Sequence, residues 1–167
     1  MKPGLRGILA GTLGLLGALS SVNADAAVDS KIYPGSMCRV ANSAWGSTTY
    51  STSYAGYLQN YPGTVGVSCP VVRDQIAGTT PASAWVSIHD AASTSSVWCA
   101  LYSANSVAGT ISYKSDWTSD AYKGDVVLVM TNVATGSGWW DTLNIKCSVP
   151  ENARLYSYAV DETVQSY

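Results

Sequence analysis

The sequence predicts an all-β fold, a two-layer β-sandwich, and its strand number also allows a jelly roll. Short runs of β-branched and aromatic residues recur after residue 26, separated by Gly, Ser, Thr, Asn and Pro. No long run of apolar residues follows the 3.6-residue helical period in that region. The length of 167 residues fits one domain, since domains commonly hold about 100–200 residues.

About nine strands are expected, and such a number of short strands is typical of a sandwich. Residues 43–53 and 79–84 are expected to form loops. Residues 125–131 are apolar on both strand faces, which predicts a central, covered strand that is the least exposed segment. The predicted strands are 36–40, 54–59, 65–69, 84–90, 97–103, 109–113, 125–131, 143–149 and 155–161.

The first 26 residues have the pattern of a secretory signal peptide. Lys2 and Arg6 provide a basic start, and residues 7–19 form an uncharged run rich in Leu, Gly and Ala. This run is shorter than the roughly 20 residues of a membrane-spanning helix. Small residues at 24 and 26 give the spacing of a cleavage site. We expect cleavage after residue 26, one domain over 27–167, export, and no membrane attachment of the mature chain.

Four cysteines form an even set in a chain expected to be exported, which favours two disulfides. They are Cys38, Cys69, Cys99 and Cys147. Neither a C-x-x-C motif nor a second histidine is present, which argues against zinc binding and thiol redox chemistry. Each cysteine shares a predicted strand face with apolar side chains, so the sulfur atoms are expected in a core between two sheets.

The spacing of the cysteines leaves three pairings open, and chain entropy does not separate them. We favour Cys38 with Cys69 and Cys99 with Cys147, because neighbouring halves of the chain then close independently.

The charge balance argues against nucleic acid as a partner. Nine basic and eleven acidic side chains give a net charge of -2, which leaves no positive surplus for neutralising phosphates. Asp116, Asp120 and Asp125 are near enough in sequence to share a calcium ion, but they lack the EF-hand order and ordinary turn aspartates explain them. We therefore expect no metal and no cofactor.

No residue pattern identifies an enzyme. His89 is the only histidine, so any histidine-dependent catalysis must use it. The sequence contains no G-x-S-x-G motif, and no carboxylate pair stands out from aspartates that form turns. No catalytic residue is assigned, and a non-enzymatic role is favoured.

The aromatic residues are the main candidates for binding. The chain has 6 Trp, 11 Tyr and no Phe, and rings with a polar edge suit surfaces where apolar contact meets water. A hairpin of residues 84–90 and 97–103 would place four polar-edged rings in one outer strip, unless a loop or second layer covers them. Two adjacent tryptophans after residue 138 point to opposite faces. The predicted ligand-binding residues are Trp85, His89, Trp98, Tyr102, Trp139 and Trp140.

Four segments occur in a recognisable order: Tyr33-Pro34-Gly35-Ser36-Met37-Cys38, Cys69-Pro70-Val71-Val72-Arg73-Asp74, Trp98-Cys99 and Cys147-Ser148-Val149-Pro150. With these segments the chain resembles a family of short, exported, uncharacterised bacterial proteins with four cysteines. The resemblance spans most of the mature region. It implies export and a disulfide-linked β domain, and it brings no activity, cofactor or catalytic residue.

Three functions are consistent with these features. The favoured one is a non-catalytic exported module that binds a glycan or a cell-surface component through exposed Trp and Tyr. The alternative is an extracellular or envelope assembly subunit, since residues 27–33 or 156–167 would each be able to add a strand to a neighbour's open sheet edge. The second alternative is a small secreted hydrolase.

Overall fold

The computed structural model describes residues 27–41, 49–52, 55–61, 63–73, 81–92, 94–136, 138 and 141–164. The predicted signal peptide and the predicted binding residues Trp139 and Trp140 lie outside this described part. Its elements are β1 (Ala27–Pro34), the 3-10 turn η1 (Gly35–Met37), β2 (Arg39–Val40), β3 (Thr49–Thr52), β4 (Leu58–Tyr61), β5 (Val65–Pro70), β6 (Ala82–Asp90), β7 (Trp98–Asn105), β8 (Gly109–Trp117), β9 (Gly124–Val133), β10 (Asp141–Val149) and β11 (Arg154–Val164).

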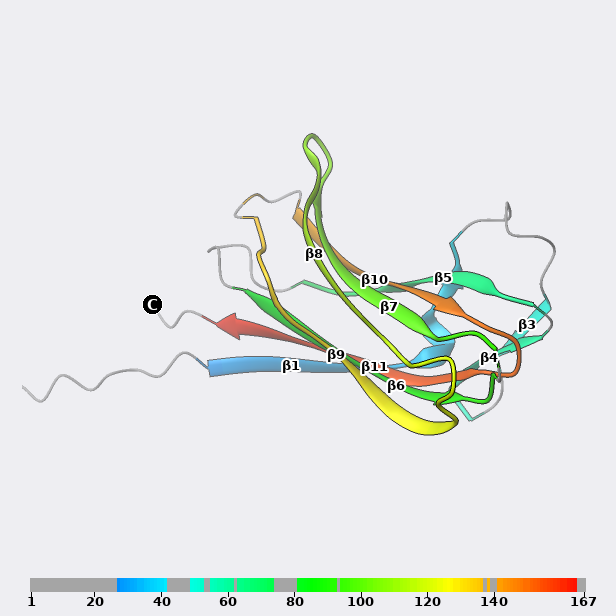
Figure 1. Ribbon diagram of the computed structural model, residues 1–167. Helices are drawn as coiled ribbons and strands as arrows, with labels where there is room; N and C mark the ends of the chain where they lie inside the picture. Colours follow the sequence, from blue (N-terminus) through cyan, green and yellow to red (C-terminus); the bar gives the residue numbers. More distant parts are fainter. Residues whose placement is uncertain are drawn as a thin grey trace, which may run out of the picture.

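The strands form two antiparallel sheets packed as a sandwich (Figure 1). The six-stranded sheet has the order β3-β4-β11-β6-β9, with β1 also paired to β11, and the five-stranded sheet has the order β2-β5-β10-β7-β8. The eight strands β4 to β11 are divided equally between the two sheets, in the orders β4-β11-β6-β9 and β5-β10-β7-β8. This is the arrangement of a jelly roll. The predicted fold class is therefore confirmed.

The core lies between the sheets and follows the alternation of the sequence. In β6 and β10, buried residues alternate with half-buried or exposed ones along the whole strand. Ile88, Leu101 and Ile145 are among the largest side chains that are fully buried. Burying an aliphatic side chain of this size stabilises a fold by roughly 1.5–3 kcal/mol, so these alternating positions fix which face of each strand turns inward.

Both predicted disulfides are present, Cys38–Cys69 and Cys99–Cys147, and all four cysteines are buried in the core. The Cys99–Cys147 bridge joins neighbouring strands of the five-stranded sheet, and the Cys38–Cys69 bridge joins the residue before β2 to β5. Cys99 lies directly opposite Cys147 in the β7–β10 ladder. Cys38 immediately precedes β2, whose first residue pairs with Ser68 beside Cys69.

Parts of the predicted strand map differ from the structure. The described residues form eleven strands where about nine were expected, because β1 was not predicted and β3 lies inside the expected loop 43–53. The expected strand 36–40 contains η1 and only a two-residue strand, β2. The strand at 125–131 is not central: β9 ends the six-stranded sheet, and Val127 and Val129 are 50% and 41% exposed. Apolar residues are common on protein surfaces, so an apolar outer face does not by itself indicate burial.

The two segments that suggested strand addition pair with each other within the chain. β1 and β11 form an antiparallel ladder that runs from Ala27 opposite Val164 to Pro34 opposite Ser157. β1 pairs with no other described strand. No helix long and apolar enough to span a bilayer occurs among the described residues.

Candidate functional site

The predicted aromatic strip is divided between opposite faces of the sandwich. β6 pairs with β11 and β9, whereas β7 pairs with β10 and β8, so the two strands do not form a hairpin. Trp85 and His89 lie on the outer face of the six-stranded sheet, and Trp98 and Tyr102 lie on the outer face of the five-stranded sheet. The assignment of these residues to outer faces was right, and their assignment to one strip was wrong.

The outer face of the five-stranded sheet carries a cluster of four rings, which we call the aromatic face: Trp98, Tyr102, Tyr113 and Trp117. Trp98 lies opposite Trp117, and Tyr102 lies opposite Tyr113, in the β7–β8 ladder. The two tyrosine rings stack with their centroids 5.3 Å apart. Tyr113 and Trp117 are 56% and 61% exposed, and Trp98 and Tyr102 are half-buried. A large apolar area is therefore open to solvent.

Two small residues separate the tryptophan row from the tyrosine row. Ala100 and Ser115 lie opposite each other between the rows, and Ala100 is fully buried although it occupies an outward position. Neighbouring side chains therefore close over it and make the surface continuous. Positions four residues apart on a strand are separated by roughly 13 Å, so a ligand that contacts both rows must be longer than one sugar ring.

A tight turn holds the hairpin that builds this face. The Asn105 side chain accepts hydrogen bonds from the backbone N–H groups of Val107 and Ala108, at 2.7 and 3.2 Å. Gly109 has a φ of 76°, a left-handed conformation that glycine adopts without steric cost. Together they direct β8 back along β7, and the hairpin rises from one side of the sandwich (Figure 1).

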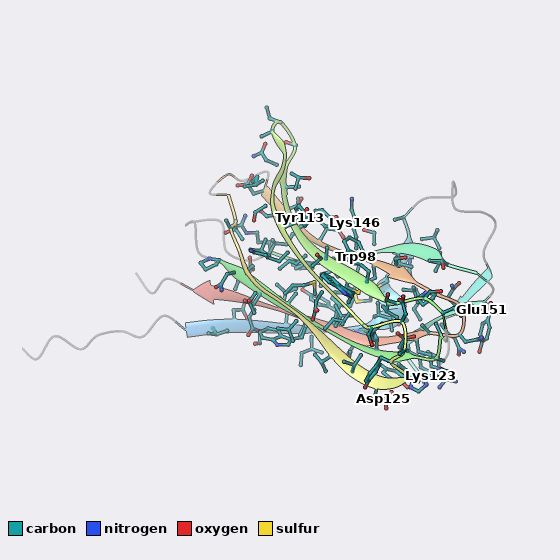
Figure 2. The ribbon with its side chains drawn as sticks, viewed as in Figure 1. Trp98, Tyr113, Lys123, Asp125, Lys146 and Glu151 are labelled. Carbon is teal, nitrogen blue, oxygen red and sulfur yellow. A yellow bond between two sulfur atoms is a disulfide. The ribbon has the colours of Figure 1, made fainter. Side chains whose placement is uncertain are left out.

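Polar side chains of β10 and β5 border the rings of β7 and β8. The Lys146 ammonium lies 5.1 Å from the centroid of the Tyr102 ring, a cation–π distance. Ser68 donates a hydrogen bond of 2.9 Å to the Asn144 side-chain oxygen, which leaves the Asn144 amide N–H groups as donors. Figure 2 shows Trp98, Tyr113 and Lys146 close together, with Asp125 on the other side of the sandwich.

The Tyr102 hydroxyl remains protonated at physiological pH. Burial raises the pKa of Tyr102 above its ordinary value, and the neighbouring Tyr113 raises it further. A protonated hydroxyl both donates and accepts hydrogen bonds, as a sugar hydroxyl also does.

A shallow hollow of about 210 Å³ continues the face beyond Trp98. Gly66, Trp98, Lys146 and Ser148 are among the residues that line it. A side chain on Gly66 would meet no heavy atom within 4 Å, so the space above this glycine is open. A flat ring stacked against Trp98 would find room above Gly66, over a lining that is almost entirely apolar.

The opposite face has different chemistry. His89 Nδ1 lies 2.8 Å from an Asp125 carboxylate oxygen, with the histidine side chain 35% and the aspartate 74% exposed. Neighbouring strands place Val129, Trp85, Ala159 and Ile32 in one outward row. His89 and the aromatic face therefore lie on different surfaces, so a His89→Ala variant tests the hydrolase hypothesis separately from binding by the rings.

The three aspartates considered for calcium have separate partners. Asp116 accepts hydrogen bonds from the backbone N–H groups of Trp117 and Val129, Asp120 accepts one from Ser96, and Asp125 pairs with His89. No three His, Cys, Asp or Glu side chains of the described residues come together in a way that holds a metal ion.

Sequence reasoning missed Tyr113, Trp117 and Lys146 as candidates. The predicted strand stopped at residue 113, whereas β8 continues to Trp117. Residues 113, 115 and 117 alternate as Tyr, Ser and Trp, and this period-2 pattern is the signal that would have extended the strand. Lys146 lies on the polar face of a strand whose alternation was already clear, but its aromatic neighbours depend on the β10–β7 pairing.

No protein-family model and no curated protein sequence matches this chain. Among solved structures it is similar to the C-terminal CBM6 of LamC, a marine laminarinase from Zobellia galactanivorans, with a TM-score of 0.47, 6% identity, and coverage of 79% of this chain and 98% of that one. It is similar to the xylan-binding module CBM86 from Roseburia intestinalis, with a TM-score of 0.46, 12% identity, and coverage of 81% and 96%.

A third similar structure is the Stig cyclase Fisc from Fischerella sp. TAU, with a TM-score of 0.44, 10% identity, and coverage of 88% of this chain and 93% of that one. The first of these proteins is named as a CBM6, the second as a xylan-binding module and the third as a cyclase. Similarity at this level transfers neither a ligand nor an activity to this chain, because one fold hosts many functions.

Proposed function

We propose that this protein is an exported, non-catalytic module that binds a glycan through the aromatic face. The observation that carries the proposal is the pair of exposed ring rows on β7 and β8, Trp98 with Trp117 and Tyr102 with Tyr113. Exposed rings clustered on one sheet face are typical of an interaction site. Its flat layout suits the apolar face of a sugar ring.

The surroundings of the rings fit a polar ligand with a flat apolar side. Ring stacking contacts the C–H face of a sugar, and the hydroxyl groups at the sugar's edge need donors and acceptors. Asn144, Ser148 and the Tyr102 hydroxyl provide such groups beside the rings. The two ring rows favour an oligosaccharide over a single sugar, because one sugar cannot reach both.

Export is part of the same proposal. Two disulfides fit an oxidising compartment, where bridges form and persist, and the basic and apolar pattern of residues 1–19 fits a signal peptide. The resemblance to short exported bacterial proteins agrees with this location.

The test is a binding assay on single alanine variants with a matched control. Trp98→Ala and Trp117→Ala are expected to weaken binding to a responsive oligosaccharide by at least about tenfold, since removing a central aromatic anchor commonly costs about 2 kcal/mol. Trp85→Ala removes a tryptophan that is half-buried, as Trp98 is, from the opposite face and is expected to leave binding unchanged. Calorimetric titration against an oligosaccharide panel measures all three. Equal losses in all three variants, or a loss only in Trp85→Ala, contradict the proposal.

A second candidate is assembly by strand addition, which the outer edge of β1 favours. β1 has no described strand partner beyond β11, and Val28 and Ile32 are 60% and 76% exposed. Open strand edges are templates for pairing with another chain. Sedimentation at high protein concentration tests this function: an Ile32→Lys variant is expected to reduce self-association, and a strictly monomeric parent protein contradicts it.

A further inference from the structure

We infer that the aromatic face selects acidic glycans, whose sugars carry carboxylate or sulfate groups, over neutral glycans of the same length. This inference rests on the proposed function and specifies the ligand class of the same site.

The outward strand positions of the five-stranded sheet contain no acidic residue among those described. Strand alternation identifies these positions, because their neighbours on each strand point into the core. Two of them are basic, Arg39 and Lys146. The full set is Arg39, Gly66, Ser68, Pro70, Trp98, Ala100, Tyr102, Ala104, Thr110, Tyr113, Ser115, Trp117, Thr142, Asn144, Lys146 and Ser148.

This charge pattern differs from that of the whole chain. Eleven acidic and nine basic side chains make the sequence net negative at -2. Described carboxylates lie elsewhere: Asp116 turns toward β9, Asp125 lies on the opposite face, and Glu162 is buried with Arg73. The positive charges on this face attract an anionic ligand, whereas the net negative charge of the rest of the protein repels it. A charged ligand is therefore oriented toward this sheet.

Lys146 is placed between the two ring rows. It lies opposite Ala100 on β7, and this small residue lets the lysine chain extend across the strand toward Tyr102. Lys146 is exposed and lines the hollow beside Trp98. No described carboxylate pairs with it. An ammonium in this position meets a charged substituent on a sugar that stacks on either ring row.

Arg39 extends the positive charge across the sheet. It lies opposite Ser68, which lies opposite Lys146, so the three residues form one row across β2, β5 and β10. One Arg39 terminal nitrogen donates to the backbone oxygens of Ser36 and Cys38, at 2.8 and 3.2 Å, which holds the guanidinium in place. The row therefore offers two cations to a ligand that lies across the strands.

The experiment compares charged and neutral members of matched ligand pairs. The pairs are a galacturonic acid hexamer with its fully methyl-esterified form, and dextran sulfate with dextran of the same length. The Lys146→Gln variant removes the central charge. The control Lys114→Gln removes an exposed lysine of β8 whose neighbour Leu101 places it on the other side of that strand. The full exported chain is titrated by calorimetry at low and high salt.

The acidic member of at least one pair is expected to bind more tightly than its neutral partner. Lys146→Gln is expected to reduce that affinity by roughly tenfold, a larger loss than for the neutral partner, since hydrogen bonds to charged groups are the strong ones. Added salt weakens the acidic interaction. Lys114→Gln behaves as the parent protein. A response to the hexamer alone identifies carboxylate as the recognised group, and a response to dextran sulfate alone identifies sulfate.

Two results separate the inference from the proposed function. Equal binding of acidic and neutral members, lost in Trp98→Ala but not in Lys146→Gln, overturns the inference and keeps the glycan-binding function. Failure of both members of both pairs and of every glycan in the wider panel overturns the proposed function itself.

Discussion

Asp116 links the two sheets at one edge of the sandwich, because its Oδ2 accepts a hydrogen bond of 2.9 Å from the backbone N–H of Val129 on β9. Its other carboxylate oxygen accepts the backbone N–H of Trp117, also at 2.9 Å. β8 and β9 are the end strands of different sheets, so this side chain takes the place of a strand partner there. The same residue also fixes the strand end that presents Trp117.

Replacing Asp116 is expected to affect stability and binding together. Asp116→Ala removes acceptors for two backbone N–H groups, and we expect a loss of about 1–3 kcal/mol in the free energy of unfolding. Binding through Trp117 weakens as well, because the end of β8 loses its attachment. Denaturant unfolding and glycan titration measure the two effects. Glu151→Ala, which removes an exposed carboxylate from the β10–β11 turn, is the control and should change neither. A normal stability in Asp116→Ala contradicts this account.

Gly35 is expected to tolerate no side chain. A Cβ on Gly35 would lie 1.9 Å from the backbone oxygen of Leu155, and main-chain atoms cannot move aside cheaply. Gly35→Ala should therefore destabilise the fold by about 1–3 kcal/mol or more, measured as a lower denaturation midpoint.

Gly66 provides the matched comparison, since a Cβ there has nothing within 4 Å. Gly66→Ala should retain stability within about 0.5 kcal/mol. It narrows the hollow beside Trp98, so we expect weaker glycan binding with unchanged unfolding. Equal destabilisation by both glycine variants is the result that contradicts the packing argument.

Each disulfide should contribute strongly to stability. The bridged cysteines are 31 and 48 residues apart, and loop-closure entropy for such loops corresponds to about 3.7 and about 4.1 kcal/mol. Replacing either pair by alanine is expected to cost about 2–5 kcal/mol in denaturant unfolding. Hydrogen exchange should distinguish the two variants. The Cys38–Cys69 bridge holds the two-residue strand β2, so removing this bridge should make the β2 amides exchange faster. A loss below about 1 kcal/mol for both variants contradicts the prediction.

The buried Tyr158 hydroxyl is expected to make the folded state less stable at strongly alkaline pH. Its hydroxyl donates a hydrogen bond of 2.7 Å to the backbone oxygen of Pro70. Burial, followed by the neighbouring Tyr33, raises the pKa of Tyr158 from 10.0 to about 12. The folded state therefore favours the protonated hydroxyl, and this contribution is complete below pH 10 and is lost as the pH rises toward 12.

Tyr158→Phe is expected to cost about 1 kcal/mol at neutral pH, because the Pro70 carbonyl loses its donor. The variant should also lose less stability than the parent protein between pH 10 and pH 12, the interval between the two pKa values. Unfolding midpoints across that interval measure the effect. Parallel curves for Tyr158→Phe and the parent protein are the contrary outcome.

Local patterns in the sequence predicted much of the fold. Period-2 alternation placed Cys69, Ile145 and Leu101 on inner faces and Trp98 and Tyr102 on outer faces, and the structure agrees in each case. The same rule failed for residues 125–131, because it reports which side chains are apolar and not whether another layer covers them. The predicted binding residues Trp139 and Trp140 lie outside the described residues.

The sequence by itself determined the β class, the inward direction of the four cysteines and the outward direction of the rings, because each depends on the geometry of a single strand. The tertiary structure decided which rings meet. The segment between β6 and β7 crosses from one sheet to the other instead of turning back, so Trp98 is opposite Trp117 rather than near His89. A short connection is able to form a hairpin within one sheet or to cross to the other sheet. Which of the two forms depends on burying the inner faces of both sheets against each other, and this burial involves the whole chain.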